Sequence, residues 1–401
     1  MHLSNLLVKR FIALILFPLK YIIIKRNIVI IQTYSNIIYC ENTKYLYEYL
    51  SVETNLEVYW HTDNLEIQRY LDSKGFKYIT RKNIFHLIFI TLRAKCVIDS
   101  GTWYFDFLNL ITNNVIKITT MHGNGPKVTV NINDLNNFNE AKYKLTKFDY
   151  VNFPSEYSKN KIGKDLCQLH SDSLVNLGYP RCDQFFDKSA IKERYINKKS
   201  TKYLCSPYKS GGKIILYTPT WRQYEYTFPL LELKSFNWLV FDEYLLKENI
   251  YFFFTIHTAK LLSNFHSPDL KRIKYIDHCE YPFYDVNEFM IEVDILINDY
   301  STTSTDYSLL SRPQIFFMPD YEKFEKVNGF VENYRDVMPG REIFTFDELL
   351  EVIDYCLKEP DKYVQKYKQK MELLLKHYNE MESGNSCKDF SDFIIQNIET
   401  N

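Results

Sequence analysis

The chain contains no aspartate or glutamate before Glu41, although it is nearly neutral as a whole. No excess of basic residues exists either, because 49 Lys and Arg stand against 50 Asp and Glu for a net charge of −1. The charge total therefore does not point to a nucleic-acid-binding protein. Its 8 cysteines include no CxxC pair. This scatter excludes the usual zinc and disulfide frameworks and indicates buried free thiols in a reducing compartment.

The acid-free start of the chain has a composition of its own. Residues 1–26 combine an apolar stretch with five basic residues, and Pro18 and Lys20 interrupt the stretch before it reaches the length of a membrane span. No small-x-small site follows, as cleavage of a signal peptide would require. The pattern favours an anchor at the membrane surface, with apolar side chains in the lipid and cations at the headgroups. An amphipathic helix packed on the protein body is the alternative.

The rest of the chain has the composition of a globular protein. Its 401 residues are 46% hydrophobic and 16% aromatic, which is sufficient for two domains with substantial cores. Neither an internal repeat nor a low-complexity tract stands out. A Lys-, Ser- and Gly-rich stretch at 197–212 is the best candidate for a linker. We therefore divide the chain into a membrane-associating segment 1–26, an N-terminal domain 27–196, the linker 197–212 and a C-terminal domain 213–401.

Short β-branched runs alternate with longer helical segments in both predicted domains. The predicted strands are 28–33, 56–60, 76–79, 96–99, 115–119, 150–153 and 174–177, then 214–218, 251–256, 273–275, 294–297 and 314–317. The predicted helices include 43–50, 65–73, 85–93, 346–357, 361–378 and 389–398. This alternation predicts an α/β fold with parallel sheets. Ligands of such folds bind outside the carboxyl ends of the strands, so the residues that follow each strand carry the candidate chemistry.

A glycine-containing loop with a histidine follows the strand 115–119. Its sequence, MHGNGPK, places His122 at the mouth of the loop as a candidate general base. Gly123 and Gly125 allow the backbone to approach a bound group closely. The spacing is not GxGxxG, so a nicotinamide-type site is not supported. A tight turn with a hydrogen-bonded histidine is the alternative interpretation.

Two arginines also follow predicted strands. Arg181, in GYPRCD, could clamp a phosphate through its planar fork, or it could pair with Asp183 or another acid. Arg222 ends the run TPTWR, in which Thr220, Trp221 and Arg222 suit a phosphate or a stacked base. A buried tryptophan at a domain edge is the alternative for that run.

Two further segments complete the set of candidates. His257 follows the strand 251–256, a position where a single histidine usually has a structural role. The run NDYSTTSTD, residues 298–306, places several hydroxyls where a helix should begin, which favours phosphate binding. Plain helix capping is the alternative, with Asp306 in the first turn.

Each motif is weak alone, but their order along one chain is specific. The series HGxxxK, GYPRxD, TPTWR, a strand-end histidine, DYSxxxxDY with RP, and MPG resembles the CDP-glycerol glycerophosphotransferase family of teichoic-acid and capsule synthesis. The resemblance implies a GT-B fold, with two Rossmann-like domains facing a central cleft. It also implies that His122 and His257 are the catalytic residues. The donor-binding residues that it implies are Met121, Gly123, Asn124, Gly125, Arg181, Thr220, Trp221, Arg222, Ser301, Thr302 and Asp306.

The resemblance also implies an activity. We expect transfer of an alditol phosphate from CDP-glycerol or CDP-ribitol to a polyprenyl-linked glycan or polymer, with release of CMP and without a metal or other cofactor. The enzyme would be a peripheral protein at the cytoplasmic face of the membrane, held there through residues 1–26. Two alternatives remain open: a GT-B glycosyltransferase that uses a nucleotide sugar, and a non-catalytic membrane-associated assembly protein.

Overall fold

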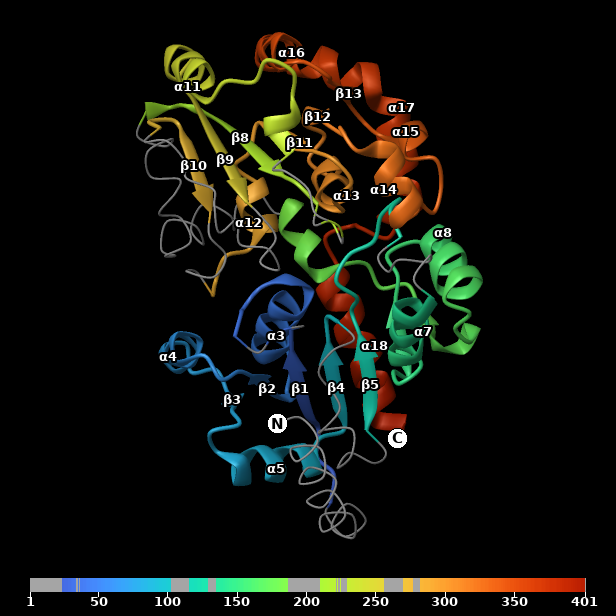
Figure 1. Cartoon of the computed structure of the whole chain (residues 1–401). Coiled ribbons are helices and arrows are strands. Elements are labelled where there is room, and N and C mark those ends of the chain that lie inside the picture. The colour runs from blue at the N-terminus through green and yellow to red at the C-terminus, as the bar shows by residue number, and fades with distance from the viewer. Residues whose placement is uncertain are drawn as a thin grey trace.

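Two parallel sheets contain all the strands of the part of the chain that the structure describes. The computed structural model describes residues 24–33, 35, 37–101, 115–128, 135–186, 210–220, 222, 224, 229–255, 270–276 and 282–400. One sheet is N-terminal and has seven strands, and the other is C-terminal and has six. Each lies between helices, which confirms the predicted α/β class with two parallel sheets (Figure 1).

The N-terminal sheet has the strand order β3-β2-β1-β4-β5-β6-β7. Its strands are β1 (Ile28–Gln32), β2 (Glu57–His61), β3 (Tyr78–Ile79), β4 (Cys96–Asp99), β5 (Ile116–Thr119), β6 (Tyr150–Asn152) and β7 (Leu174–Val175). The helical segments between and after them are α3 (Glu41–Glu53), α4 (Leu65–Ser73), α5 (Ile84–Arg93), α7 (Leu135–Leu145), α8 (Glu156–Ser158), the π-helix Lys159–Leu166, and the short 3-10 helices Ser171–Ser173 and Pro180–Phe185.

The C-terminal sheet has the order β10-β9-β8-β11-β12-β13, which is the Rossmann order. Its strands are β8 (Lys213–Thr218), β9 (Ile250–Thr255), β10 (Ile273–Ile276), β11 (Ile295–Asn298), β12 (Gln314–Phe316) and β13 (Arg341–Glu342). The helices are the 3-10 helix Pro229–Glu232, α11 (Trp238–Lys247), α12 (Val286–Met290), α13 (Thr303–Ser308), α14 (Tyr321–Val327), α15 (Tyr334–Val337), α16 (Phe346–Lys358), α17 (Pro360–Tyr378) and α18 (Ser386–Thr400).

Both sheets bury both of their faces, which explains why their strands are continuous apolar runs. In β8, Ile215 and Tyr217 pack with α11 and α16, while Ile214 and Leu216 pack on the opposite face with α12 and α13. Such runs are typical of parallel strands covered by helices on two sides. The runs therefore predict these strands to within a residue or two.

The last helix differs from the predicted domain division. The segment 213–401 was expected to form one domain, but α18 returns to the N-terminal sheet, where Phe390 and Ile394 pack with Val29 and Ile31 of β1. Figure 1 shows α18 beside the N-terminal strands. The physical reason is the apolar face of α18, which packs in the same core cluster as α3 and α4, on one face of the N-terminal sheet. Most of the predicted linker 197–212 lies outside the described residues.

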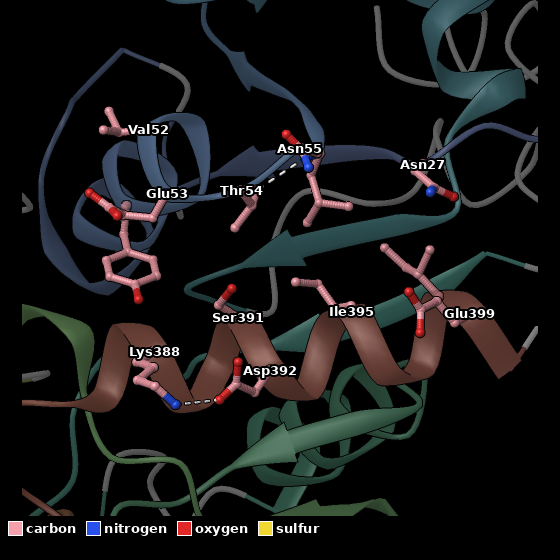
Figure 2. Close-up of a pocket in the computed structure, with 13 residues that line it drawn as sticks. Asn27, Val52, Glu53, Thr54, Asn55, Lys388, Ser391, Asp392, Ile395 and Glu399 are labelled. Carbon is pink, nitrogen blue, oxygen red and sulfur yellow. Dashed lines mark hydrogen bonds and ion pairs between the residues drawn. The ribbon is translucent and has the colours of Figure 1, made fainter.

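A surface pocket of about 470 Å³ lies between the end of α3 and α18 (Figure 2). Its lining is mixed, and the polar part includes Glu53, Asn55 and the ion pair between Lys388 and Asp392. Asn27 also lines it, next to the amino end of β1, whereas ligands of parallel sheets bind at the carboxyl ends. We therefore place the candidate site elsewhere.

The strands of the two sheets run toward each other, so that both carboxyl edges face the middle of the molecule (Figure 1). At this junction α3 contacts α12 through a buried ion pair of Lys44 with Glu288, and Lys44 Nζ lies 3.8 Å from Asp285. The loops after β1, β5, β7, β8 and β11 therefore meet between the two domains. This region contains most of the residues predicted to be functional.

Candidate functional site

The carboxyl edge of the N-terminal sheet carries a buried row of polar side chains. Gln32, at the end of β1, donates from Nε2 to Asp99 Oδ2 (2.7 Å), and its Oε1 lies 2.9 Å from His61 Nδ1. Burial raises the pKa of Asp99 to about 7 and lowers the pKa of His61 to about 4. The row therefore contains a neutral imidazole and a carboxyl group that titrates near neutral pH.

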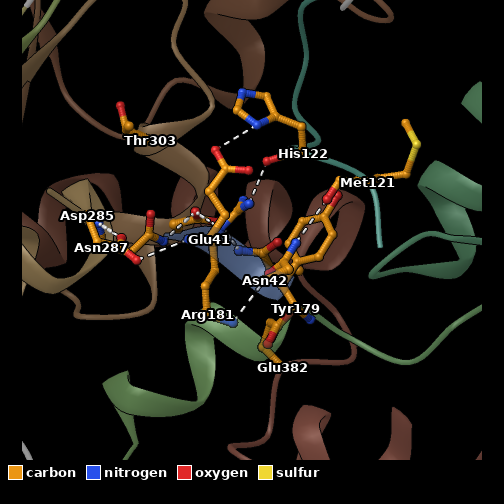
Figure 3. A network of polar contacts seen from close by, with 12 residues as sticks. Glu41, Asn42, Met121, His122, Tyr179, Arg181, Asp285, Asn287, Thr303 and Glu382 are labelled. Atoms are coloured by element: carbon orange, nitrogen blue, oxygen red, sulfur yellow. Dashed lines mark hydrogen bonds and ion pairs between the residues drawn. The ribbon is translucent and has the colours of Figure 1, made fainter. Parts of the chain in front are cut away.

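His122 projects from the loop after β5, and just over half of its side chain is exposed. Its Nδ1 lies 2.7 Å from Glu41 Oε1, at the start of α3 (Figure 3). Glu41 itself is largely buried, with a side-chain exposure of 15%. When Nδ1–H donates to the carboxylate, Nε2 is the nitrogen left to accept a proton. The arrangement suits the predicted general base.

The two glycines of the His122 loop allow close packing against the other domain. A Cβ at Gly123 would lie 2.9 Å from Thr302 Oγ1, and a Cβ at Gly125 would lie 3.1 Å from Thr302 Cγ2. The glycines therefore allow a close approach, as predicted, but the group that they approach in this structure is the turn before α13. Asn124 between them is buried, and its Nδ2 donates to no described residue.

Asn42 and Arg181 fix the backbone on both sides of His122. Asn42 donates from Nδ2 to the Met121 carbonyl (3.0 Å), and Arg181 donates from Nη1 to the His122 carbonyl (2.5 Å). The backbone N–H of Arg181 also donates to Asn42 Oδ1 (3.3 Å). Figure 3 shows this network between α3, the loop and the 3-10 helix after β7. Met121 adopts a left-handed conformation, with φ of 58°.

The Arg181 guanidinium is buried against Asp306 of α13. Its Nε donates to Asp306 Oδ2 (2.9 Å), which also accepts from Asn287, while Oδ1 accepts from Asn379 (3.3 Å). The alternative in which Arg181 pairs with an acid is therefore the one observed, although the acid is Asp306 and not Asp183. Asp183 instead accepts from the backbone at the start of α18. A donor-binding role of Arg181 and Asp306 remains a prediction.

Arg222 is fully buried between two aspartates. Nη1 pairs with Asp299, and Nε and Nη2 donate to Asp320 (3.0 and 2.9 Å). Burial opposes the charge of Arg222, but attraction to Asp299 outweighs it and raises the pKa of Arg222. Burial would also raise the pKa of Asp320, but hydrogen bonds from Arg222 outweigh it and lower that pKa. Thr220 donates to Asp299 Oδ1 (2.6 Å). Thr220 and Arg222 therefore contact the protein itself, and their donor-binding role remains a prediction.

Lys127 is a cation of a different kind. It ends the HGNGPK loop, whose backbone pairs with Phe330 of the C-terminal domain. Its side chain makes no hydrogen bond or ion pair with the described residues, and burial lowers the pKa of its ammonium group to about 8, partly offset by Asp299. An ammonium group in this state gains from an added phosphate charge.

The turn before α13 and the first residue of the helix present hydroxyls to the junction. Ser301, Thr302 and Thr303 are partly exposed, and the Thr302 side chain caps no backbone N–H of the helix. Thr303 Oγ1 lies 2.9 Å from Thr218 Oγ1 at the end of β8. Ser301 caps the helix only weakly, because its Oγ accepts from the Thr303 N–H at a long distance of 3.4 Å.

Other predicted features lie outside the described residues, namely His257, Trp221 and residues 1–23. In the part of the chain that the structure describes, no group of three or more His, Cys, Asp or Glu side chains could hold a metal ion. Within the same part, no helix is long and apolar enough to cross a membrane. The six cysteines described are free and buried.

The sequence model of one family matches almost the whole chain. It is described as CDP-Glycerol:Poly(glycerophosphate) glycerophosphotransferase, and it matches residues 15–396. The chain belongs to this glycerophosphotransferase family. The resemblance inferred from the ordered motifs is thus confirmed, and so is the class of enzyme.

Known members of the glycerophosphotransferase family differ in length. The chain is 22% identical over 390 residues to the teichoic acid glycerol-phosphate transferase of Staphylococcus aureus, covering 92% of this chain and 93% of that protein. It is 28% identical over 305 residues to the teichoic acid poly(glycerol phosphate) polymerase of Staphylococcus epidermidis, covering 74% of this chain but only 38% of that protein. A solved structure of the wall teichoic acid polymerase TagF superposes with a TM-score of 0.72 at 23% identity, over 99% of this chain and 98% of that one. The GT-B-like fold is therefore shared.

Sequence reasoning on this glycerophosphotransferase missed four residues of the junction: Glu41, Asn42, Lys127 and Asp299. Each had a usable signal. Glu41 and Asn42 follow β1, and Asp299 follows β11, so they belong to the carboxyl edges of the sheets, where ligands of such folds bind. Lys127 is the lysine of the HGxxxK motif, and its place in that motif was the signal.

Proposed function

We propose that this chain transfers glycerol phosphate from CDP-glycerol to a hydroxyl of a membrane-linked glycan or polymer, with release of CMP, in teichoic-acid or capsule-type synthesis. The observation that carries the proposal is the contact between the His122 loop and the turn before α13. A candidate base from one domain lies there against a hydroxyl-rich turn from the other. Membership of the glycerophosphotransferase family supports the choice of substrate class.

In the proposed reaction His122 is the general base. Its Nε2 removes the proton of the acceptor hydroxyl while the hydroxyl oxygen attacks the β-phosphorus of the donor. The bond from that phosphorus to the oxygen of CMP then breaks, and CMP leaves with the electron pair. Phosphoryl transfer depends mainly on positioning and on stabilisation of charge. The exposed ring of His122 is accessible to an acceptor from solvent.

The donor phosphates would be held where the two domains meet. Ser301 and Thr302 offer partly exposed hydroxyls, and Lys127 offers an ammonium group without a described partner. His257 and Trp221, which lie outside the described residues, belong to the same proposal. We propose no metal, because the lysine and the hydroxyls supply the charge stabilisation that a metal would otherwise provide.

We further propose that the enzyme works as a peripheral protein on the cytoplasmic face of the membrane. Residues 1–26 would supply the anchor. Helix α5 supports this: Phe85 and Phe89 are exposed one turn apart, Arg81 and Lys82 precede them, and Arg26 N–H donates to the Arg93 carbonyl at the helix end (2.9 Å). Aromatic residues beside cations suit a bilayer surface. Binding to anionic vesicles should weaken in a Phe85→Ser, Phe89→Ser variant, and unchanged binding would refute a role of α5.

The decisive experiment measures CMP release by purified protein with CDP-glycerol, CDP-ribitol or a UDP-sugar, each with a membrane-lipid acceptor extract. His122→Ala should lower the rate by about 10²–10⁴-fold, as expected for the loss of a general base. The matched control is His170→Ala, because His170 is exposed on the surface of the N-terminal domain.

Each donor outcome selects one function. CMP from CDP-glycerol supports the proposal, and CMP from CDP-ribitol alone changes the alditol. UDP released from a UDP-sugar would make the protein a GT-B glycosyltransferase. Failure to bind or turn over any donor would favour a non-catalytic assembly protein.

A further inference from the structure

The residue that contacts His122 adopts an unusual backbone conformation. Glu41 is the first residue of α3, and its φ is 67°, in the left-handed region that residues with a Cβ rarely adopt. Met121, directly before His122, is also left-handed, with φ of 58°. Conformations of this kind persist only where the surroundings impose them, and they cluster at functional sites. One of these two left-handed residues, Glu41, forms the ion pair with His122, and the other, Met121, directly precedes His122.

The surrounding contacts impose this geometry from several directions. The Glu41 N–H donates to Asp285 Oδ2 of the other domain (3.2 Å). The next residue, Asn42, is fully buried and donates to the Met121 carbonyl (3.0 Å). Two consecutive residues of α3 therefore contact two consecutive residues of the loop: Glu41 pairs with His122, and Asn42 pairs with Met121 (Figure 3). This double pairing fixes the distance and the direction of the carboxylate relative to the imidazole.

The carboxylate of Glu41 makes few contacts with described residues other than His122. Its Oε2 is buried and accepts no hydrogen bond from them, while Oε1 lies 2.7 Å from His122 Nδ1. Glu41 is not the N-cap residue of α3, which is Cys40, although its charge lies in the first turn, where the helix dipole favours it. Among the described residues, the direct side-chain partner of this largely buried carboxylate is therefore His122.

We propose that Glu41 is a positioning residue for His122. Its carboxylate accepts Nδ1–H, which leaves the Nε2 lone pair toward the acceptor hydroxyl, and its negative charge stabilises the imidazolium that forms. In the step, the acceptor O–H bond breaks, the proton moves to Nε2, the O–P bond forms and the bond from phosphorus to CMP breaks. The Nδ1–H proton stays between His122 and Glu41. The inference rests on the proposed function only in that His122 is the base.

A direct test of the geometry needs no activity. In uniformly 15N-histidine-labelled protein, the His122 ring signals, assigned by their loss in His122→Ala, report which nitrogen carries the proton in the neutral ring. The wild type should show the Nδ1–H tautomer, whereas Glu41→Gly should shift it toward Nε2–H, the form favoured by a free histidine side chain. An Nε2–H tautomer in the wild type would overturn the proposal.

Glu41→Gly also separates catalysis from folding. Glycine adopts φ near 67° without steric cost, so the urea midpoint should be unchanged or higher than in the wild type. The kcat with CDP-glycerol should nevertheless fall about 10–100-fold, part of the general-base contribution, with KM for CDP-glycerol altered less than about threefold. Glu53→Gln, at the exposed far end of the same helix, is the matched control and should retain full kcat.

A double variant completes the test. If Glu41 acts only through His122, adding Glu41→Gly to His122→Ala should cause no further loss of kcat. Two independent losses that multiply would overturn the proposal. Lack of transfer from every CDP donor in the wild type would refute the proposed function, and the tautomer measurement would still decide the pairing of Glu41 with His122.

Discussion

Replacing Arg222 by methionine should destabilise the C-terminal domain far more than it alters donor binding. The Arg222 and Asp299 side chains are both fully buried, at 0% exposure, and Asp320 completes the group. Methionine is similar in length but cannot donate, so Asp299 would keep its charge without its main counter-ion. Removing one partner of a buried ion pair typically costs about 3–5 kcal/mol. The Arg222 guanidinium also packs over the Tyr300 ring at 5.1 Å, a contact that would be lost as well.

Thermal and urea unfolding measure the effect. At about 2–4 °C per kcal/mol for a domain of this size, the melting temperature should fall by roughly 10 °C. The control is Arg335→Met: Arg335 also makes a two-pronged pair, with Glu342, but its side chain is 42% exposed, and such pairs contribute at most about 1 kcal/mol. Equal small shifts in both variants, combined with a raised KM for the CDP donor only in Arg222→Met, would refute this reasoning and make Arg222 a donor ligand. Adding Asp299→Asn should recover part of the loss.

Three further predictions address pH, donor binding and the glycine loop. Burial raises the pKa of Asp99 to about 7, so the contribution of Asp99 to stability is complete below about pH 4 and is lost as the pH rises through 7, a change on the order of 4 kcal/mol. Asp99→Asn should flatten the pH dependence of the free energy of unfolding in urea between pH 5 and 8, and an unaltered slope would contradict this. Lys127→Met should raise KM for CDP-glycerol about tenfold, the effect of roughly one lost charge-assisted hydrogen bond, with little change in melting temperature; a normal KM would exclude a phosphate contact. Gly123→Ala should lower stability by about 1–3 kcal/mol through overlap with Thr302 Oγ1, and a combined Thr302→Ala change should restore the melting temperature; a loss that persists would point to another contact.

The sequence was sufficient for the strands and for the position of the His122 loop, because both depend on local patterns. Four consecutive apolar residues from Ile28 to Ile31 are buried on both faces of β1, as a covered parallel strand requires. The His122 loop follows its strand directly, so the sheet topology carries it to the domain junction. Nothing beyond the order of residues was needed for these inferences.

The partners of the arginines could not be predicted in the same way. Arg181 and Asp306 are 125 residues apart, and a phosphate clamp and a buried ion pair require the same residue type at the same strand end. Arg222 was closer to prediction, since Thr218 pairs with Asn298 in the sheet, which brings the residues after β8 next to Asp299. Only the tertiary packing, between the domains for Arg181 and within the C-terminal domain for Arg222, decides whether such a cation faces a ligand or an aspartate.

The return of α18 to the N-terminal sheet has a consequence for how the chain is made. Ile394 and Phe390 complete the core around Val29 and Ile31, yet the ribosome must synthesise the whole C-terminal domain between these two groups. During that interval the part of the first sheet that α18 will cover stays exposed. Domains made first usually fold first. Here the first domain to emerge is the last to be finished, and its exposed strip is the surface that a chaperone would have to shield.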